Sequence, residues 1–211
     1  LKRVDLETNE TREYDFGTES DTTFVGIECI YCEGERVWLI TTDGVLHQLD
    51  DANDGFRKAH SFVPTRGRAG LIGPGATPPI SRDMDGNLWI ATDGFGLFRF
   101  SPETEEFDSF RHDGNDAYSI NSDRISGIYR DRNGMFWLNT QGAGVDLVLP
   151  EGPTVQHLAH IPESEQSLGH PDIWAVLQDH EGICWFGHQA GLDRFDPSTE
   201  RFHHFQQSAD D

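Results

Sequence analysis

The chain has 211 residues, and its 16 Lys and Arg against 37 Asp and Glu give a formal net charge of −21 at pH 7. A charge this negative repels nucleic-acid backbones and anionic membrane surfaces, which argues against both as partners. Hydrophobic residues make up 36% of the chain, too many for a disordered protein, and no run of about 18 apolar residues predicts direct membrane insertion.

Four tryptophan-centred segments recur along the chain at nearly constant spacing. The tryptophans are Trp38, Trp89, Trp137 and Trp185, so the spacings are 51, 48 and 48 residues. Turns rich in Asp and Gly, such as Asp131–Gly134, precede the later three, and apolar residues occupy both faces of the tryptophan strand. A four-stranded repeat of this length is typical of radially stacked blades. The sequence therefore predicts an all-β fold, a β-propeller, with a flat β-solenoid as the alternative.

The repeats also predict how the chain is divided. Residues 1–16 match only the last two strands of a unit and predict a partial N-terminal blade. Because this half-blade lacks partners within the chain, we expect an arc of a seven-bladed ring whose edges pair with missing blades or with another chain. The start at Leu1 rather than Met fits a fragment or a processed chain. Four complete four-stranded blades are predicted at about residues 23–63, 64–112, 122–161 and 171–206.

The three cysteines, Cys29, Cys32 and Cys184, are an odd number and cannot form a complete disulfide framework. Cys29 and Cys32 form a C-x-x-C pair, but no second pair is present to build a tetrahedral zinc site. The pair also lies in a predicted strand, whereas a redox-active pair normally opens a helix, whose dipole lowers the thiol pKa. We therefore predict no chemistry at these cysteines.

The repeats resemble those of the two-component regulator propeller family. Its pattern has a Ser-Leu-Ser lead-in, an Asp-x-x-Gly turn, a strand similar to Leu-Trp-Ile-Gly-Thr, and a final Phe-Asp-Pro-x-Thr-x-x-Phe. Residues 118–140 and 167–187 match the first part, and Gly191–Phe202 is the stretch that matches best. The resemblance covers nearly the whole chain, although residues 62–80, rich in Pro and Gly, replace the usual lead-in.

This resemblance implies a sensory role in the periplasm. Such repeats form extracytoplasmic parts of inner-membrane receptors with a histidine kinase or diguanylate cyclase output, in which two seven-bladed rings precede an immunoglobulin-like domain. Seven repeats need about 340 residues, so the chain would supply roughly two thirds of one ring. The partners that the resemblance implies are the remaining blades, the immunoglobulin-like domain of the same receptor, and a second copy in a homodimer.

Candidate ligand contacts lie on loops that lead into the inner strands, because blade ends converge near the central channel. Two arginines in the longest loop could clamp a carboxylate or a sugar acid, and two aromatic residues could stack on a sugar ring. A histidine and an aspartate could add hydrogen bonds. For all of these the structural alternative is a solvated loop, blade packing or a turn. The candidates are Arg66, Arg68, Tyr118, His170, Asp172 and Trp174.

Patterns for enzymes and metal sites are incomplete. Residues 50–55 begin like a calcium-binding loop, but Ala52 and Ser61 stand where acidic ligands are needed. Residues 81–89 resemble a sialidase turn, but its Gly comes one residue late. Neighbouring strand residues point to opposite faces, so adjacent histidines cannot easily share an ion. We therefore expect no metal, cofactor or catalytic residue. The histidine pairs considered are His157 with His160, and His203 with His204.

The function that the sequence predicts is a non-enzymatic, extracytoplasmic ligand-sensing domain of a two-component-type receptor, with an oligosaccharide as the ligand. Two alternatives stay open. One is a propeller enzyme, either a lyase or a glycosidase. The other is a scaffold that binds only proteins.

Overall fold

The computed structural model describes residues 2–4, 11–13, 26–33, 36–50, 55–61, 72, 79–149 and 155–206. These residues contain eighteen β-strands and no helix, so the prediction of an all-β chain is confirmed. None of the described segments offers a helix that could cross a membrane. The chain divides into two compact units, residues 1–70 and 71–211.

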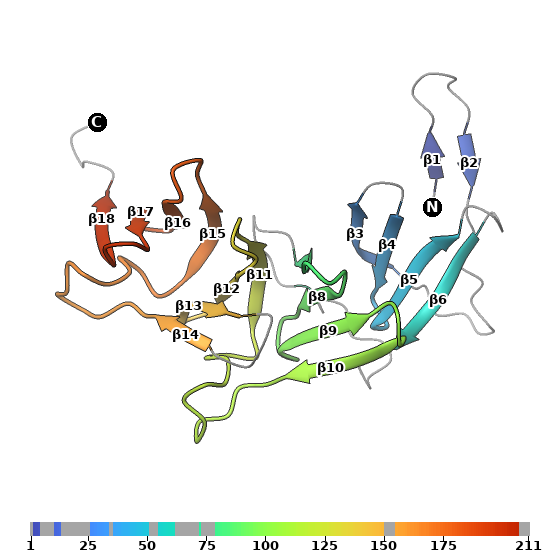
Figure 1. The fold of residues 1–211 in the computed structure, drawn as a ribbon, viewed down its shortest axis with the longest axis horizontal. Coiled ribbons are helices and arrows are strands. Elements are labelled where there is room, and N and C mark those ends of the chain that lie inside the picture. Colours follow the sequence, from blue (N-terminus) through green and yellow to red (C-terminus); the bar gives the residue numbers. More distant parts are fainter. Residues whose placement is uncertain are drawn as a thin grey trace. The chain divides into compact units, whose positions relative to one another are not determined.

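The first unit contains two antiparallel sheets (Figure 1). The smaller sheet pairs β1 (Lys2–Val4) with β2 (Thr11–Glu13), and both strands fall in the predicted partial blade. The larger sheet, here called blade 1, has four strands that pair in chain order. They are β3 (Ile27–Glu33), β4 (Arg36–Thr41), β5 (Val45–Asp50) and β6 (Gly55–Ser61).

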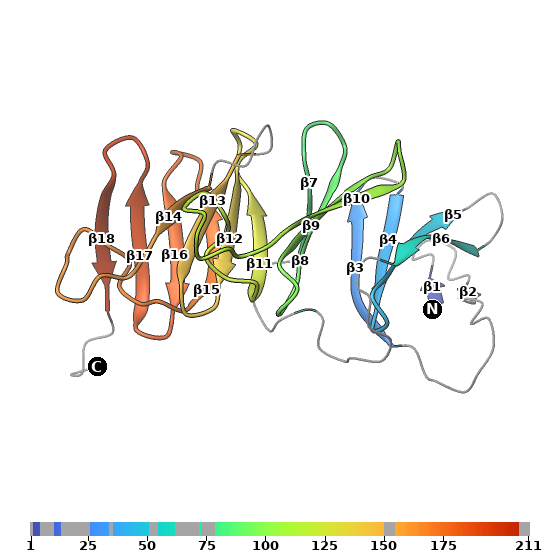
Figure 2. The same cartoon turned by 90° about the horizontal axis from the view of Figure 1, so that it is seen from below.

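The second unit contains three four-stranded antiparallel sheets, each again pairing its strands in chain order (Figure 2). Blade 2 consists of β7 (Ile80–Arg82), β8 (Leu88–Ala91), β9 (Leu97–Ser101) and β10 (Glu106–Phe110). Blade 3 consists of β11 (Ile125–Arg130), β12 (Phe136–Thr140), β13 (Gly144–Val148) and β14 (Val155–Leu158). Blade 4 consists of β15 (Ile173–Gln178), β16 (Cys184–His188), β17 (Gly191–Asp196) and β18 (Arg201–Phe205).

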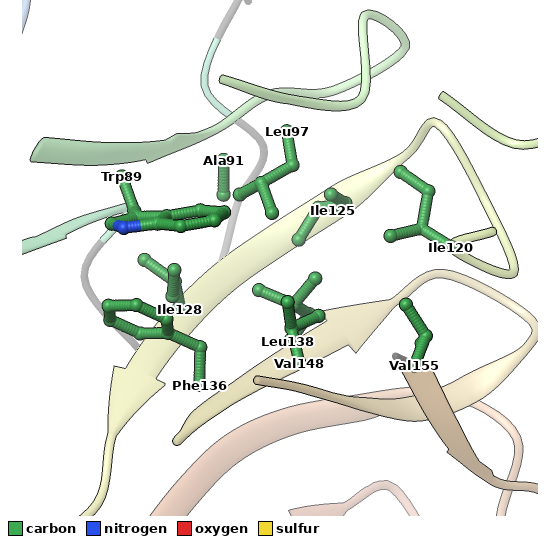
Figure 3. Close-up of a cluster of buried hydrophobic side chains, with 10 residues drawn as sticks. All are labelled: Trp89, Ala91, Leu97, Ile120, Ile125, Ile128, Phe136, Leu138, Val148 and Val155. Carbon is green, nitrogen blue, oxygen red and sulfur yellow. The ribbon is translucent and has the colours of Figure 1, made fainter. Parts of the chain in front are cut away.

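In blades 2 and 3 the tryptophan packs against the blade that follows it. Trp89 lies in one buried cluster with Ile128 and Phe136 of blade 3, and the ring centroids of Trp89 and Phe136 are 5.1 Å apart (Figure 3). Trp137 lies in a second cluster, with Phe186 of blade 4 at 5.7 Å. Burying an aromatic side chain contributes about 1.5–3 kcal/mol, so these contacts are a main source of cohesion between blades.

An aspartate in the turn before each of these tryptophans holds both the turn and the indole. Asp131 accepts hydrogen bonds from the backbone N–H groups of Asn133 and Met135 on one carboxylate oxygen, and from the indole N–H of Trp137 on the other. The contact between carboxylate and indole recurs in all three blades of the unit. Its distances are 2.9 Å for Asp83 with Trp89, 3.1 Å for Asp131 with Trp137 and 2.7 Å for Asp179 with Trp185.

These hydrogen bonds favour the charged carboxylates. Burial alone would raise the pKa of Asp83, but hydrogen bonds from Trp89 and Asn87 outweigh it, so the pKa lies below its ordinary value. The hydrogen bond from Trp185 likewise lowers the pKa of Asp179. Blade 1 differs, because Cys32 occupies the position six residues before Trp38.

We expect the substitution Asp131→Ala to destabilise the second unit by about 2–4 kcal/mol, since it leaves two turn amides and a buried indole N–H without their acceptor. Urea denaturation followed by tryptophan fluorescence measures this loss. Asp196→Ala is the matched control, because Asp196 caps an exposed turn through Ser198 and contacts no indole. Equal effects of the two substitutions would contradict a special role for the contact with the indole.

Candidate functional site

Two long loops connect the blades of the second unit, and they carry three of the predicted site residues. Residues 111–124, here called loop A, connect β10 to β11 and include Tyr118. Residues 159–172, loop B, connect β14 to β15 and include His170 and Asp172. Trp174 follows in β15. The other two predicted residues, Arg66 and Arg68, lie outside the described residues.

A buried Asp–His pair attaches loop A to blade 3. Asp146 of β13 accepts a hydrogen bond of 2.7 Å from the backbone N–H of Asn121, and its other oxygen lies 2.8 Å from Nδ1 of His157 on β14. Nε2 of His157 in turn lies 3.2 Å from the backbone carbonyl oxygen of Ala117. The pair therefore holds two separate points of loop A against β13 and β14.

The carbonyl oxygen of Ala117 can only accept, so a proton on Nε2 of His157 completes that contact. Burial raises the pKa of Asp146 more than its hydrogen bonds from Asn121 and His157 lower it.

An equivalent Asp–His pair in blade 4 holds loop B. Asp193 of β17 accepts a hydrogen bond of 2.7 Å from the backbone N–H of Gly169, and lies 2.6 Å from Nδ1 of His204. Nε2 of His204 lies 3.1 Å from the carbonyl oxygen of Glu165. Burial alone would lower the pKa of His204, but the bonds to Asp193 and Glu165 outweigh it, and the pKa is raised.

The sequence analysis missed both pairs, although a signal for them exists. In each blade the histidine follows the aspartate by eleven residues, and the two face each other across neighbouring strands. From the sequence alone, His157 and His204 are candidates only as metal-binding partners of other histidines. Among the described residues, no group of three or more His, Cys, Asp or Glu side chains is placed to hold a metal ion.

The structure brings His170 and Asp172 together but separates them from Tyr118. Nδ1 of His170 accepts the backbone N–H of Asp172, and the ring of His170 stacks on that of His188 at 5.9 Å. The carboxylate of Asp172 accepts the backbone N–H of Gly142 in blade 3. These contacts serve loop B, so a ligand role for these residues stays a prediction.

A hollow of about 470 Å³ opens where loop A crosses between blades 2 and 3. None of its lining residues comes from the first strands β7 and β11, whereas the sequence analysis expected ligand contacts on the loops near the central channel. Its lining has an apolar floor, an aromatic wall and a polar rim. The lining residues used below are Trp89, Phe110, Tyr118, Arg99, Arg111 and Asp116.

The wall of the hollow combines buried and exposed aromatic rings. Phe110 stacks on the buried Trp89 with ring centroids 5.4 Å apart, whereas Tyr118 is 65% exposed. The backbone N–H of Tyr118 donates to the carboxylate of Asp116, and the preceding carbonyl is held by His157. Tyr118 is therefore an exposed ring on a firmly attached loop. The equivalent position of loop B, also directly before a serine, is Gln166.

Two arginines at the rim of the hollow form ion pairs with neighbouring aspartates. Nε of Arg99 lies 3.0 Å from Asp108, and its guanidinium lies over the ring of Trp89. Arg111 contacts Asp123 at 3.3 Å and lies over the ring of Phe95. Both guanidinium groups are thus oriented at the rim, where an oxygen-rich ligand could meet them.

The cysteines form no disulfide in the described part of the chain. Burial, together with the nearby Cys32 and Glu28, raises the pKa of Cys29 to about 11. Burial likewise raises the pKa of Cys184 to about 12. The raised pKa of Cys29 disfavours its thiolate, which opposes the reactivity of Cys29 as one member of a redox pair.

Comparison with solved structures identifies β-propeller domains. The extracellular domain of the hybrid two-component system BT3049 from B. thetaiotaomicron superposes with a TM-score of 0.66 at 18% identity, over 85% of this chain and 24% of that one. The corresponding domain of BT4673 gives 0.51 at 15% identity, over 97% and 32%. Virginiamycin B lyase from Staphylococcus aureus gives 0.64 at 13% identity, over 97% and 62%.

These similarities confirm the propeller fold and go no further, because the identities are low. The chain spans less than two thirds of each of these proteins. No family model matches the sequence, and no curated protein matches it. The number of blades in a complete ring stays a prediction.

We expect the second unit to lose stability as the pH rises above about 6.5, the ordinary pKa of histidine. The pKa of His204 is raised in the folded state, so its contribution is fully present below that value and is lost as the pH rises through the raised pKa. Thermal unfolding between pH 5.5 and 9 measures the decline. His204→Gln should flatten the decline, whereas His203→Gln on the same strand should not. If the stability of both variants declines with pH to the same extent, the pair of Asp193 and His204 is not the cause of the decline.

Proposed function

We propose that the chain is an extracytoplasmic ligand-sensing propeller domain of a two-component-type receptor in the periplasm, and that the hollow beside loop A binds the ligand. The observation that carries this proposal is the exposed ring of Tyr118 on a loop fixed at two points by Asp146 and His157. The likeness to extracellular domains of two hybrid two-component systems supports the sensing role.

The lining of the hollow favours a carbohydrate as the ligand. Sugars present C–H faces that stack on aromatic rings such as Tyr118, and hydroxyl groups that bond to guanidinium, carboxylate and hydroxyl side chains. The hollow offers these in Arg99, Arg111, Asp116 and Ser119 around an apolar floor. Its volume of about 470 Å³ lies within the usual range of about 300–1,000 Å³ for small-molecule sites.

The contacts of His157, His188 and His204 support binding without turnover by these three side chains. Nε2 of His157 and of His204 each bond to a backbone carbonyl, so neither is available to move a substrate proton. The side chain of His188 is 2% exposed and thus out of reach of a substrate. The likeness to a lyase makes catalysis the principal alternative outcome of the test below.

A ligand in this hollow would contact blade 2, blade 3 and loop A at once. It would therefore favour whichever arrangement of the two blades fits it best. Such a preference shifts a conformational equilibrium only by the difference in affinity for the two states. Through this shift in the conformational equilibrium, ligand binding in the hollow would be transmitted to a partner domain.

The test is a calorimetric and thermal-shift screen of the chain against neutral and acidic oligosaccharides. For the sugar that binds, Tyr118→Ala should weaken binding about tenfold, because an aromatic contact of this kind is worth about 1.4 kcal/mol. Gln166→Ala, at the matching position of loop B, should leave binding unchanged. If Tyr118→Ala leaves sugar binding unchanged, or if no sugar binds, the hollow is not the ligand site. Chemical conversion of the sugar, followed by mass spectrometry, would favour an enzyme instead.

A further inference from the structure

Two valines in the floor of the hollow stand where blade 4 carries phenylalanines. Val148 of β13 pairs with Val155 of β14, and both side chains line the hollow. In blade 4 the matching pair is Phe195 of β17 with Phe202 of β18. The match follows from the strand register, because Val148 and Phe195 each pair with the residue directly before the tryptophan of their blade. The two blades therefore place side chains of different size at the same point of the sheet.

The two phenylalanine rings fill their part of the contact between blades 3 and 4. Phe195 and Phe202 lie with ring centroids 4.6 Å apart, and the ring of Phe195 lies 6.4 Å from that of Trp137. Between blades 2 and 3 the two valines occupy the corresponding place in the cluster around Trp89 (Figure 3). The hollow of about 470 Å³ opens at this place. The hollow therefore lies where two short side chains stand in place of two rings.

The floor of the hollow presents hydrocarbon, whereas the polar side chains lie at its rim. Leu97 and Ile120 join the two valines in the floor. The indole N–H of Trp89 already donates to Asp83, so it is not available to a ligand. A sugar hydroxyl held against this floor would lose its hydrogen bonds to water and gain none, whereas a methyl group would lose nothing. The polar side chains of the rim are Arg99, Arg111, Asp116 and Ser119.

We propose that the hollow selects sugars that carry a methyl-bearing substituent, and that Val148 and Val155 set this specificity. The substituent is either an N-acetyl group or the methyl group of a 6-deoxy sugar, and its methyl lies against the two valines. The hydroxyl groups of the sugar then face the polar rim, and its ring stacks on Tyr118. This inference rests on the function proposed above, because it names the class of sugar that the same hollow binds.

Calorimetry with two matched pairs of sugars tests the proposal. N,N′-diacetylchitobiose and cellobiose differ in the substituent at C2, and methyl L-fucoside and methyl L-galactoside differ in the methyl group at C6. In at least one pair we expect the methyl-bearing sugar to bind about tenfold more tightly, as is typical of an apolar pocket that gains one methyl group. The pair that shows the preference identifies the substituent.

Val155→Phe should remove this preference, because a ring at the matching position of blade 4 fills the corresponding space. Gln156→Phe is the matched control. It adds the same ring to the same strand, but Gln156 is exposed on the opposite face of β14, since neighbouring strand residues point to opposite faces. This control should leave the preference unchanged.

A second variant, Val155→Thr, keeps the shape of the floor and adds a hydroxyl group, so it should reduce the preference without filling the hollow. Circular dichroism checks that each variant is folded. Sugar binding that depends on Tyr118 but shows no preference in either pair would overturn this inference and leave the proposed function standing. A preference that survives in the folded Val155 variants would also overturn it. If no sugar binds, the proposed function and this inference are both wrong.

Discussion

The hydrogen bond between a turn carboxylate and the indole six residues later is the contact on which the second unit depends. A tryptophan can be buried between blades only if its N–H has an acceptor, because an unpaired buried donor is costly. The aspartate supplies that acceptor and uses its other oxygen to close the turn. One residue thereby joins the geometry of the hairpin to the packing between blades.

A second constraint connects this fold to its candidate function. The loops between blades would lose much of their order without a tie to the sheets, and each is tied by a buried aspartate and a histidine on the neighbouring strand. In loop A this tie holds the segment that carries Tyr118 beside the hollow. A ring fixed before binding loses little conformational freedom when a ligand arrives, which favours affinity.

The sequence by itself determined the strands, the turns and the tryptophans that recur from blade to blade. These features are local: the alternation of strands has a period of two, and the Asp-x-x-Gly turn and its tryptophan lie within seven residues. It also predicted Tyr118 as a candidate contact on a loop. Only the tertiary structure decided that Tyr118 lines a hollow with Trp89 and Val155, since these residues come from three different segments. The pairs of Asp146 with His157 and Asp193 with His204 likewise depend on the cross-strand register, which sets side chains eleven residues apart face to face.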